Sequence, residues 1–98
     1  MKSDISLKAA VYLRAAELVE QGWCKGALAI DASGNHVHEC SDAAVAWCQI
    51  GSVIRACREL NTSETKCFNA YSLDADWNDR PETTQSQVAA RLREEAFR

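Results

Sequence analysis

The sequence predicts an all-α fold, a compact bundle of three to four helices that forms a single domain over residues 1–98. With one proline and four glycines in 98 residues, the chain has few turn-forming residues, while alanine and other strong helix formers are abundant. Apolar residues also recur at helical spacing in several segments. The 47% apolar and 26% charged residues are typical of a globular protein with one small core.

The first and last helices are indicated by their ends as well as by their periodicity. The first is predicted over residues 7–21, with Asp4 or Ser6 as the capping residue and Gly22 in a left-handed conformation where the helix stops. The last is predicted over residues 85–96, because the sequence TQSQ at its start has the capping-box pattern.

The second helix is predicted over residues 42–60 and at the centre of the bundle. Ser41 can cap it, and the carboxylate of Asp42 favours the positive helix start. Its apolar residues lie around most of the circumference, as in a helix surrounded by others. Gly51 lies in its middle, where glycine is unfavourable, which indicates a close approach of another backbone.

The remaining segments include irregular loops at about residues 22–40 and 72–83, and a short helix at 63–71. Residues 27–30 fit either one turn of helix or a short strand, and periodicity does not decide between them. The predicted core consists of large apolar side chains and cysteines from all these parts of the chain: Leu7, Val11, Leu18, Trp23, Leu28, Val45, Trp47, Cys48, Ile50, Ile54, Cys57, Leu60, Phe68, Trp77, Val88 and Leu92.

Charge and cysteine content exclude several classes of protein. The net charge of −3 leaves no excess of lysine and arginine, so direct nucleic-acid binding is not expected. The sequence shows neither a signal peptide nor an apolar stretch long enough to span a bilayer. The odd count of five cysteines does not fit a secreted disulfide framework. We therefore expect a protein of the reducing cytosol.

Three separated blocks carry a resemblance to a known family. GWCKGALAIDASG, AVAWCQIGSV and DWNDRPETTQSQV resemble an uncharacterised family of small proteins from bacterial and phage genomes, with GWCxGALA, AWCxxGA and WND patterns. The match extends from about Leu13 to Leu92. Ser52 stands where the family usually has alanine, and the HVHEC sequence is not a family signature. The resemblance implies a compact helical fold and a bacterial or phage origin, and no reaction.

Two Trp-Cys pairs, Trp23-Cys24 and Trp47-Cys48, stand out in a chain of this size. Tryptophan and free cysteine are both readily buried, so both pairs are predicted to lie in the core. The alternative is thiol chemistry, for which a cysteine needs a base or a positive neighbourhood. The chain has two histidines, both beside a predicted turn, and no Cys-x-x-Cys pattern.

The HVHEC sequence is the best candidate for a metal site. In an extended segment, His36 and His38 would lie on one side, and Cys40 could add a thiolate. Cys24 or Cys67 could complete a set of four ligands. The spacing matches no zinc-finger pattern, and a polar surface loop is the competing interpretation.

The loop around the WND sequence has two interpretations. In the structural one, Trp77 anchors the loop on the core while Asn78 and Asp79 arrange the start of the last helix. In the functional one, a tryptophan among carboxylates forms a surface that recognises a basic partner. The candidate partner-binding residues are Asp74, Asp76, Trp77, Asn78, Asp79 and Glu82.

The leading functional hypothesis is a small acidic cytosolic protein that binds a host or phage protein with a basic surface, without catalysis, cofactor or metal. One concrete form is a phage-borne inhibitor of a bacterial defence system, such as an anti-CRISPR protein, which could block a positively charged nucleic-acid channel. The alternative is a small-molecule- or metal-binding domain, which could be an enzyme, that uses the HVHEC segment or the WND loop.

Overall fold

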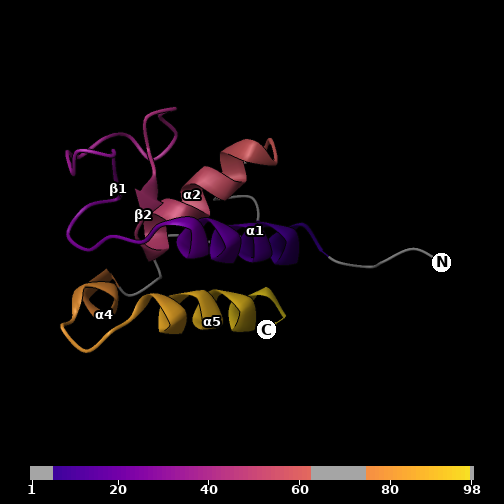
Figure 1. Cartoon of the computed structure of the whole chain (residues 1–98). Coiled ribbons are helices and arrows are strands. Elements are labelled where there is room, and N and C mark those ends of the chain that lie inside the picture. Colours follow the sequence, from indigo (N-terminus) through magenta and orange to yellow (C-terminus); the bar gives the residue numbers. More distant parts are fainter. Residues whose placement is uncertain (1–5, 63–74, 98) are drawn as a thin grey trace.

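The computed structural model describes residues 6–62 and 75–97 (Figure 1). The predicted helix at 63–71 lies outside these residues. The described residues form four helices and a two-stranded antiparallel sheet: α1 (Leu7–Gln21), β1 (Ala29–Ile30), β2 (Ala46–Trp47), α2 (Gln49–Glu59), α4 (Ala75–Asp79) and α5 (Gln85–Ala96). The mostly helical fold is therefore confirmed, but the sheet shows that the fold is not purely all-α.

Helix α1, and not α2, lies at the centre of the fold. It packs against both α2 and α5, and Figure 1 shows it between them. The prediction of a central second helix was wrong. The physical reason is that α1 buries small side chains, Ala9, Ala15 and Ala16, beside larger ones, which lets neighbouring helices approach it from two sides.

The helix ends that depend on local sequence are confirmed. The side chain of Ser6 caps α1 and accepts a hydrogen bond from Ala9 N. The capping box of α5 is present, with Thr84 and Gln87 each accepting a hydrogen bond from the other's backbone N–H. The loop predicted at 72–83 is corrected in its described part, because α4 occupies Ala75–Asp79.

The predicted second helix was wrong at its start. Helix α2 begins only at Gln49, and its N-cap is Cys48, whose Sγ accepts a hydrogen bond from Gly51 N at 3.3 Å. The residues before it form β2, which pairs with β1 in the register Ala29↔Trp47 and Ile30↔Ala46. An apolar stretch fits a buried strand as well as a buried helix, and pairing with a distant segment decided between them. The open question at 27–30 is resolved in the same way, with a strand.

Two glycines allow backbones to approach closely. A Cβ atom added at Gly51 would overlap the backbone oxygen of Leu28, which confirms the close approach expected there. A Cβ atom at Gly22 would overlap the backbone oxygen of Val45. Gly22 has φ −171°, an extended conformation, so the left-handed helix end expected there was wrong. Its role is to let the chain run beside β2.

The core is built around α1 and agrees with the predicted one in half of its members: Val11, Leu18, Trp47, Cys48, Ile50, Cys57, Val88 and Leu92. Trp23, Ile54 and Trp77 are partly buried and pack against it. The prediction was wrong for Leu7, Leu28, Val45 and Leu60, which are 40–48% exposed and lie at element ends or in connections. Phe68 lies outside the described residues. Within those residues, no helix is long and apolar enough to cross a lipid bilayer.

Candidate functional site

The buried side chain of Asn78 joins the three sequence blocks. Its Oδ1 accepts hydrogen bonds from Trp23 Nε1 at 2.8 Å and from Gln49 N at 3.0 Å. Its Nδ2 donates to Cys24 O at 3.2 Å and to Asp79 Oδ1 at 2.9 Å. Both lone pairs and both N–H groups of the amide are therefore used, and the WND sequence is fixed against the first Trp-Cys pair and against Gln49, the residue that follows the second pair.

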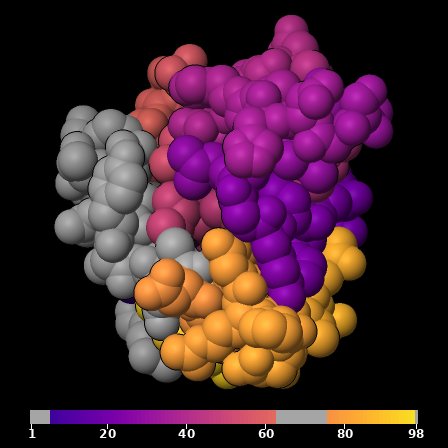
Figure 2. Space-filling view, turned by 90° about the vertical axis from the view of Figure 1, so that its left-hand side faces the viewer, coloured from indigo at the N-terminus to yellow at the C-terminus, as the bar shows by residue number. Residues whose placement is uncertain are grey.

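Further contacts hold α4 and the turn after it against the first block. Asp79 Oδ1 also accepts a hydrogen bond from Gly26 N at 3.0 Å, and Lys25 Nζ donates to Arg80 O at 2.5 Å. Figure 2 shows this face, where the orange α4 region lies directly against the purple segment of the first block. The two segments, more than fifty positions apart in sequence, thus form one continuous surface.

A small pocket of about 240 Å³ opens where the blocks meet. We call it the three-block pocket. Its apolar lining comes from the first and second blocks, and its polar groups from the third: Gly26, Ala27, Leu28, Cys48, Ile50, Asn78 and Asp79. The volume is below that of a site for a drug-sized ligand, about 300–1,000 Å³, and is sufficient for one long side chain.

The thiols at this pocket are poor nucleophiles. Burial, with smaller contributions from neighbouring Cys48 and Asp79, raises the pKa of Cys24 to about 11. Burial also raises the pKa of Cys48, although hydrogen bonds from the backbone of Gly51 and Ile50 oppose the shift. Because the thiolate is the reactive form, and neither histidine lines the pocket, the geometry favours binding over thiol chemistry.

The predicted partner-binding residues lie in different environments. Asp76, Asp79 and Glu82 are exposed, whereas Asn78 is 1% exposed and has its amide fully used. A direct partner contact through the Asn78 side chain is therefore not expected. Asp74 lies outside the described residues.

Trp77 is half-buried and packs against the core, as the structural interpretation of this loop expected. The guanidinium of Arg91 lies 4.9 Å from the centre of the Trp77 ring. This cation–π contact brings a positive charge close to the third block. Asn78 and Asp79 differ from that interpretation. They bond the first and second blocks instead of the start of α5.

The HVHEC segment forms a second cluster of functional groups. Donor atoms of His38, Glu39 and Cys40 all lie within 4.8 Å of one another. His36 is exposed, forms a β-bridge with Ile30 and does not belong to this group. The candidate set of His36, His38 and Cys40 therefore changes in one member. Glu39, which lies between the other two in sequence, takes the place expected for His36.

The other two cysteines considered for this site have separate outcomes. Cys24 is buried beside the three-block pocket and does not belong to the cluster. Cys67 lies outside the described residues. Among the residues that the structure describes, the three consecutive side chains are the one group with metal-ligating spacing.

Comparison with known proteins agrees with the resemblance seen in the three blocks. A family model described as a family of unknown function, DUF6197, matches residues 6–98. No curated protein matches the chain significantly, and no solved structure does. The three blocks that meet at Asn78 all lie within the matched region.

Proposed function

Because the chain belongs to DUF6197, a family of unknown function, we propose its function from its own geometry: it binds a basic segment of a partner protein. In this proposal, the three-block pocket takes one lysine or arginine side chain of the partner as an anchor. The observation that carries the proposal is an apolar pocket with the carboxylate of Asp79 in its lining.

The pocket is complementary to a long cationic side chain. Lysine and arginine have an apolar stem and a charged head, and the stem is commonly buried while the head finds a polar partner. Ala27, Leu28 and Ile50 offer apolar contacts for the stem, and Asp79 offers a carboxylate for the head. The carboxylate is already oriented, because its Oδ1 accepts hydrogen bonds from Gly26 N and Asn78 Nδ2. Its other oxygen accepts no hydrogen bond from the described residues and can receive the ligand.

Charge supports the same kind of partner. The net charge is −3, and the exposed carboxylates of Asp76 and Glu82 lie in the segment that carries Asp79. Complementary charge accelerates encounter and selects against acidic partners. The raised pKa of the Cys24 and Cys48 thiols supports binding without catalysis. A phage-borne inhibitor of a bacterial defence system, acting in the host cytosol, would be one protein of this kind, and that identity stays a prediction.

The direct test is a titration of isotope-labelled protein with short arginine- and lysine-containing peptides, followed by NMR. The expected shifts are those of the Gly26, Leu28 and Ile50 amides, with no response to the peptide whose lysines are acetylated. Asp79→Asn keeps the shape of the side chain and removes its charge. We expect it to weaken binding by about tenfold or more, the value of one charged hydrogen bond.

Glu82→Gln is the matched control, because it removes one exposed charge of the same segment outside the pocket. We expect less than about a twofold effect, as for a peripheral charge. Equal weakening by both variants would contradict the pocket proposal and indicate general charge attraction. Affinity capture from bacterial lysate with wild type and Asp79→Asn, analysed by mass spectrometry, would then identify the natural partner as the protein lost in the variant.

A further inference from the structure

The cluster at His38, Glu39 and Cys40 has a geometry close to that of a metal site. Its three donor atoms are an imidazole nitrogen, a carboxylate oxygen and a thiol sulfur, all within 4.8 Å of one another. Ligand atoms around a tetrahedral zinc ion, with bonds of about 2.0–2.3 Å, lie roughly 3.3–3.8 Å apart. Side-chain rotations that close the cluster by about 1 Å would therefore suffice.

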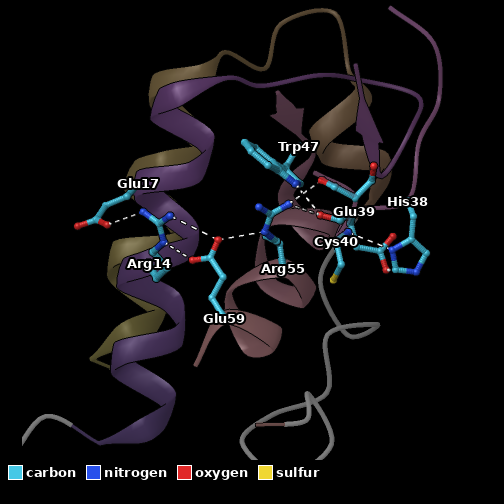
Figure 3. A network of polar contacts seen from close by, with 9 residues as sticks. Arg14, Glu17, His38, Glu39, Cys40, Trp47, Arg55 and Glu59 are labelled. Atoms are coloured by element: carbon cyan, nitrogen blue, oxygen red, sulfur yellow. Dashed lines mark hydrogen bonds and ion pairs between the residues drawn. The ribbon is translucent and has the colours of Figure 1, made fainter. Parts of the chain in front are cut away.

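The backbone of the cluster is fixed by the rest of the fold. The carbonyl oxygen of Glu39 accepts hydrogen bonds from Trp47 Nε1 at 2.9 Å and from Arg55 Nη1 at 3.1 Å, and Arg55 Nη1 also donates to Ser41 O at 3.1 Å (Figure 3). The carbonyl groups on both sides of Cys40 are thus held before any ion arrives. A site on a backbone that is already held loses less entropy on binding.

The carboxylate of Glu39 faces the imidazole of His38. The residue is 9% exposed, and its Oε2 lies 3.6 Å from His38 Nε2, an ion-pair contact that is too long for a hydrogen bond. Buried carboxylates are normally hydrogen-bonded, paired or bound to a metal. A cation between the two side chains would be bound by both of them.

The three side chains line a pocket of about 310 Å³ that shares no residue with the three-block pocket. Cys57 of α2 also lines this pocket. A carboxylate and a thiolate would neutralise a divalent ion, so the nearby positive charge of Arg58, which also lines the pocket, does not oppose the filled site.

We propose that His38, Glu39 and Cys40 bind a zinc ion. The mixed nitrogen, oxygen and sulfur ligands suit zinc and exclude magnesium and calcium, which require oxygen ligands alone. His38 Nδ1 now accepts a hydrogen bond from Cys40 N at 3.0 Å, so coordination through Nε2 moves the ring proton to Nδ1 and breaks that bond. The site lies in the segment that connects β1 to β2, beside α2. It is separate from the three-block pocket.

The test is a titration of the reduced, metal-free protein with Co²⁺, a spectroscopic substitute for zinc. We expect one cobalt per chain, with the intense visible bands of tetrahedral cobalt and a near-ultraviolet band from thiolate-to-cobalt charge transfer, both removed by added Zn²⁺. Cys40→Ser should remove the charge-transfer band. His38→Ala should weaken the affinity more than about 100-fold, beyond the effect of losing an outer-shell contact.

His36→Ala is the matched control, since this histidine is exposed and lies outside the cluster. It should leave affinity and spectra unchanged. Glu39→Gln keeps the size of the buried side chain and should also weaken binding while retaining the helical circular dichroism spectrum. The proposal is overturned by a wild type without tetrahedral cobalt bands, by bands that survive His38→Ala and Cys40→Ser, or by loss of binding in folded His36→Ala. None of these readouts depends on peptide binding.

Discussion

At the scale of single residues, Asn78 has the largest structural role among the polar side chains of the third block. Its hydrogen-bond partners Trp23, Cys24 and Gln49 are 55, 54 and 29 positions away. An asparagine offers two donors and two acceptors at the end of a short stem, and here all four are used. An aspartate would replace both donors by acceptors and would face the carbonyl oxygen of Cys24. The WND pattern therefore specifies how three segments meet.

We predict that Asn78→Ala lowers the free energy of unfolding by about 2–4 kcal/mol. The reason is that the half-buried Trp23 Nε1 and the buried Gln49 N lose their acceptor, and each buried unsatisfied donor costs about 1–3 kcal/mol. Urea denaturation followed by tryptophan fluorescence measures the change. Asp76→Ala, an exposed position of the same helix, should change stability by less than about 0.5 kcal/mol. Equal, small effects of both would show that Asn78 does not hold the blocks together.

At the scale of secondary-structure elements, local signals and non-local pairing had different predictive value. The ends of α1 and α5 follow from caps a few residues away, so the sequence was sufficient for Ser6 and for the capping box at Thr84. The start of α2 depends on the pairing of β2 with β1, a strand that precedes it by about seventeen positions in the sequence. An apolar stretch contains no information about which distant segment will pair with it.

The candidate sites show the same division. The carboxylates of the third block could be expected at the surface, and Asp76, Asp79 and Glu82 are exposed. The partners of Asn78 could not be predicted, because they come from two other blocks. At HVHEC, sequence alone indicated the ligand types. Which three side chains converge depends on the folded backbone, and the group holds Glu39 in place of His36.

The packing of α2 against the first block gives the second prediction. Replacing glycine by alanine in an ordinary helix stabilises it by about 1 kcal/mol. At Gly51 we expect the opposite, a loss of more than about 2 kcal/mol, because the new Cβ would overlap the backbone oxygen of Leu28, which no rotamer change can relieve. Thermal unfolding by circular dichroism measures it.

Gly26→Ala is the matched comparison for Gly51→Ala. Gly26 has φ +75° and open space where the new Cβ atom would lie, so only the left-handed backbone is penalised, by about 1–2 kcal/mol. A Gly51→Ala protein as stable as wild type would mean that α2 and the Leu28 backbone are not in close contact.

At the scale of the whole molecule, polar contacts connect the central helix to the parts around it. Glu59 at the end of α2 accepts hydrogen bonds from Arg14 Nε of α1 at 2.6 Å and from Arg55 Nε at 3.0 Å (Figure 3). Arg55 in turn holds the carbonyl oxygen atoms of Glu39 and Ser41. On the other side of α1, Gln85 Nε2 of α5 donates to Val19 O at 2.7 Å. The network therefore couples α1 to α2 and, through Arg55, to the proposed zinc site.

This network predicts a specific pH dependence of stability. The hydrogen bond from Arg14, followed by that from Arg55, lowers the pKa of Glu59 in the folded protein. Since the unfolded chain binds this proton more readily, the contribution of Glu59 is fully present above its unfolded pKa of about 4.3 and is lost as the pH falls through the lower folded value.

Glu59→Gln should therefore lower the free energy of unfolding by about 1 kcal/mol at neutral pH, a value limited by solvent screening. The difference from wild type in urea denaturation should shrink progressively as the pH falls below about 4.3. Glu17→Gln removes the more exposed partner of Arg14, at 60% side-chain exposure, and should have a smaller effect at every pH. A difference between Glu59→Gln and wild type that stays constant across this range would show that the carboxylate charge does not hold α1 and α2 together.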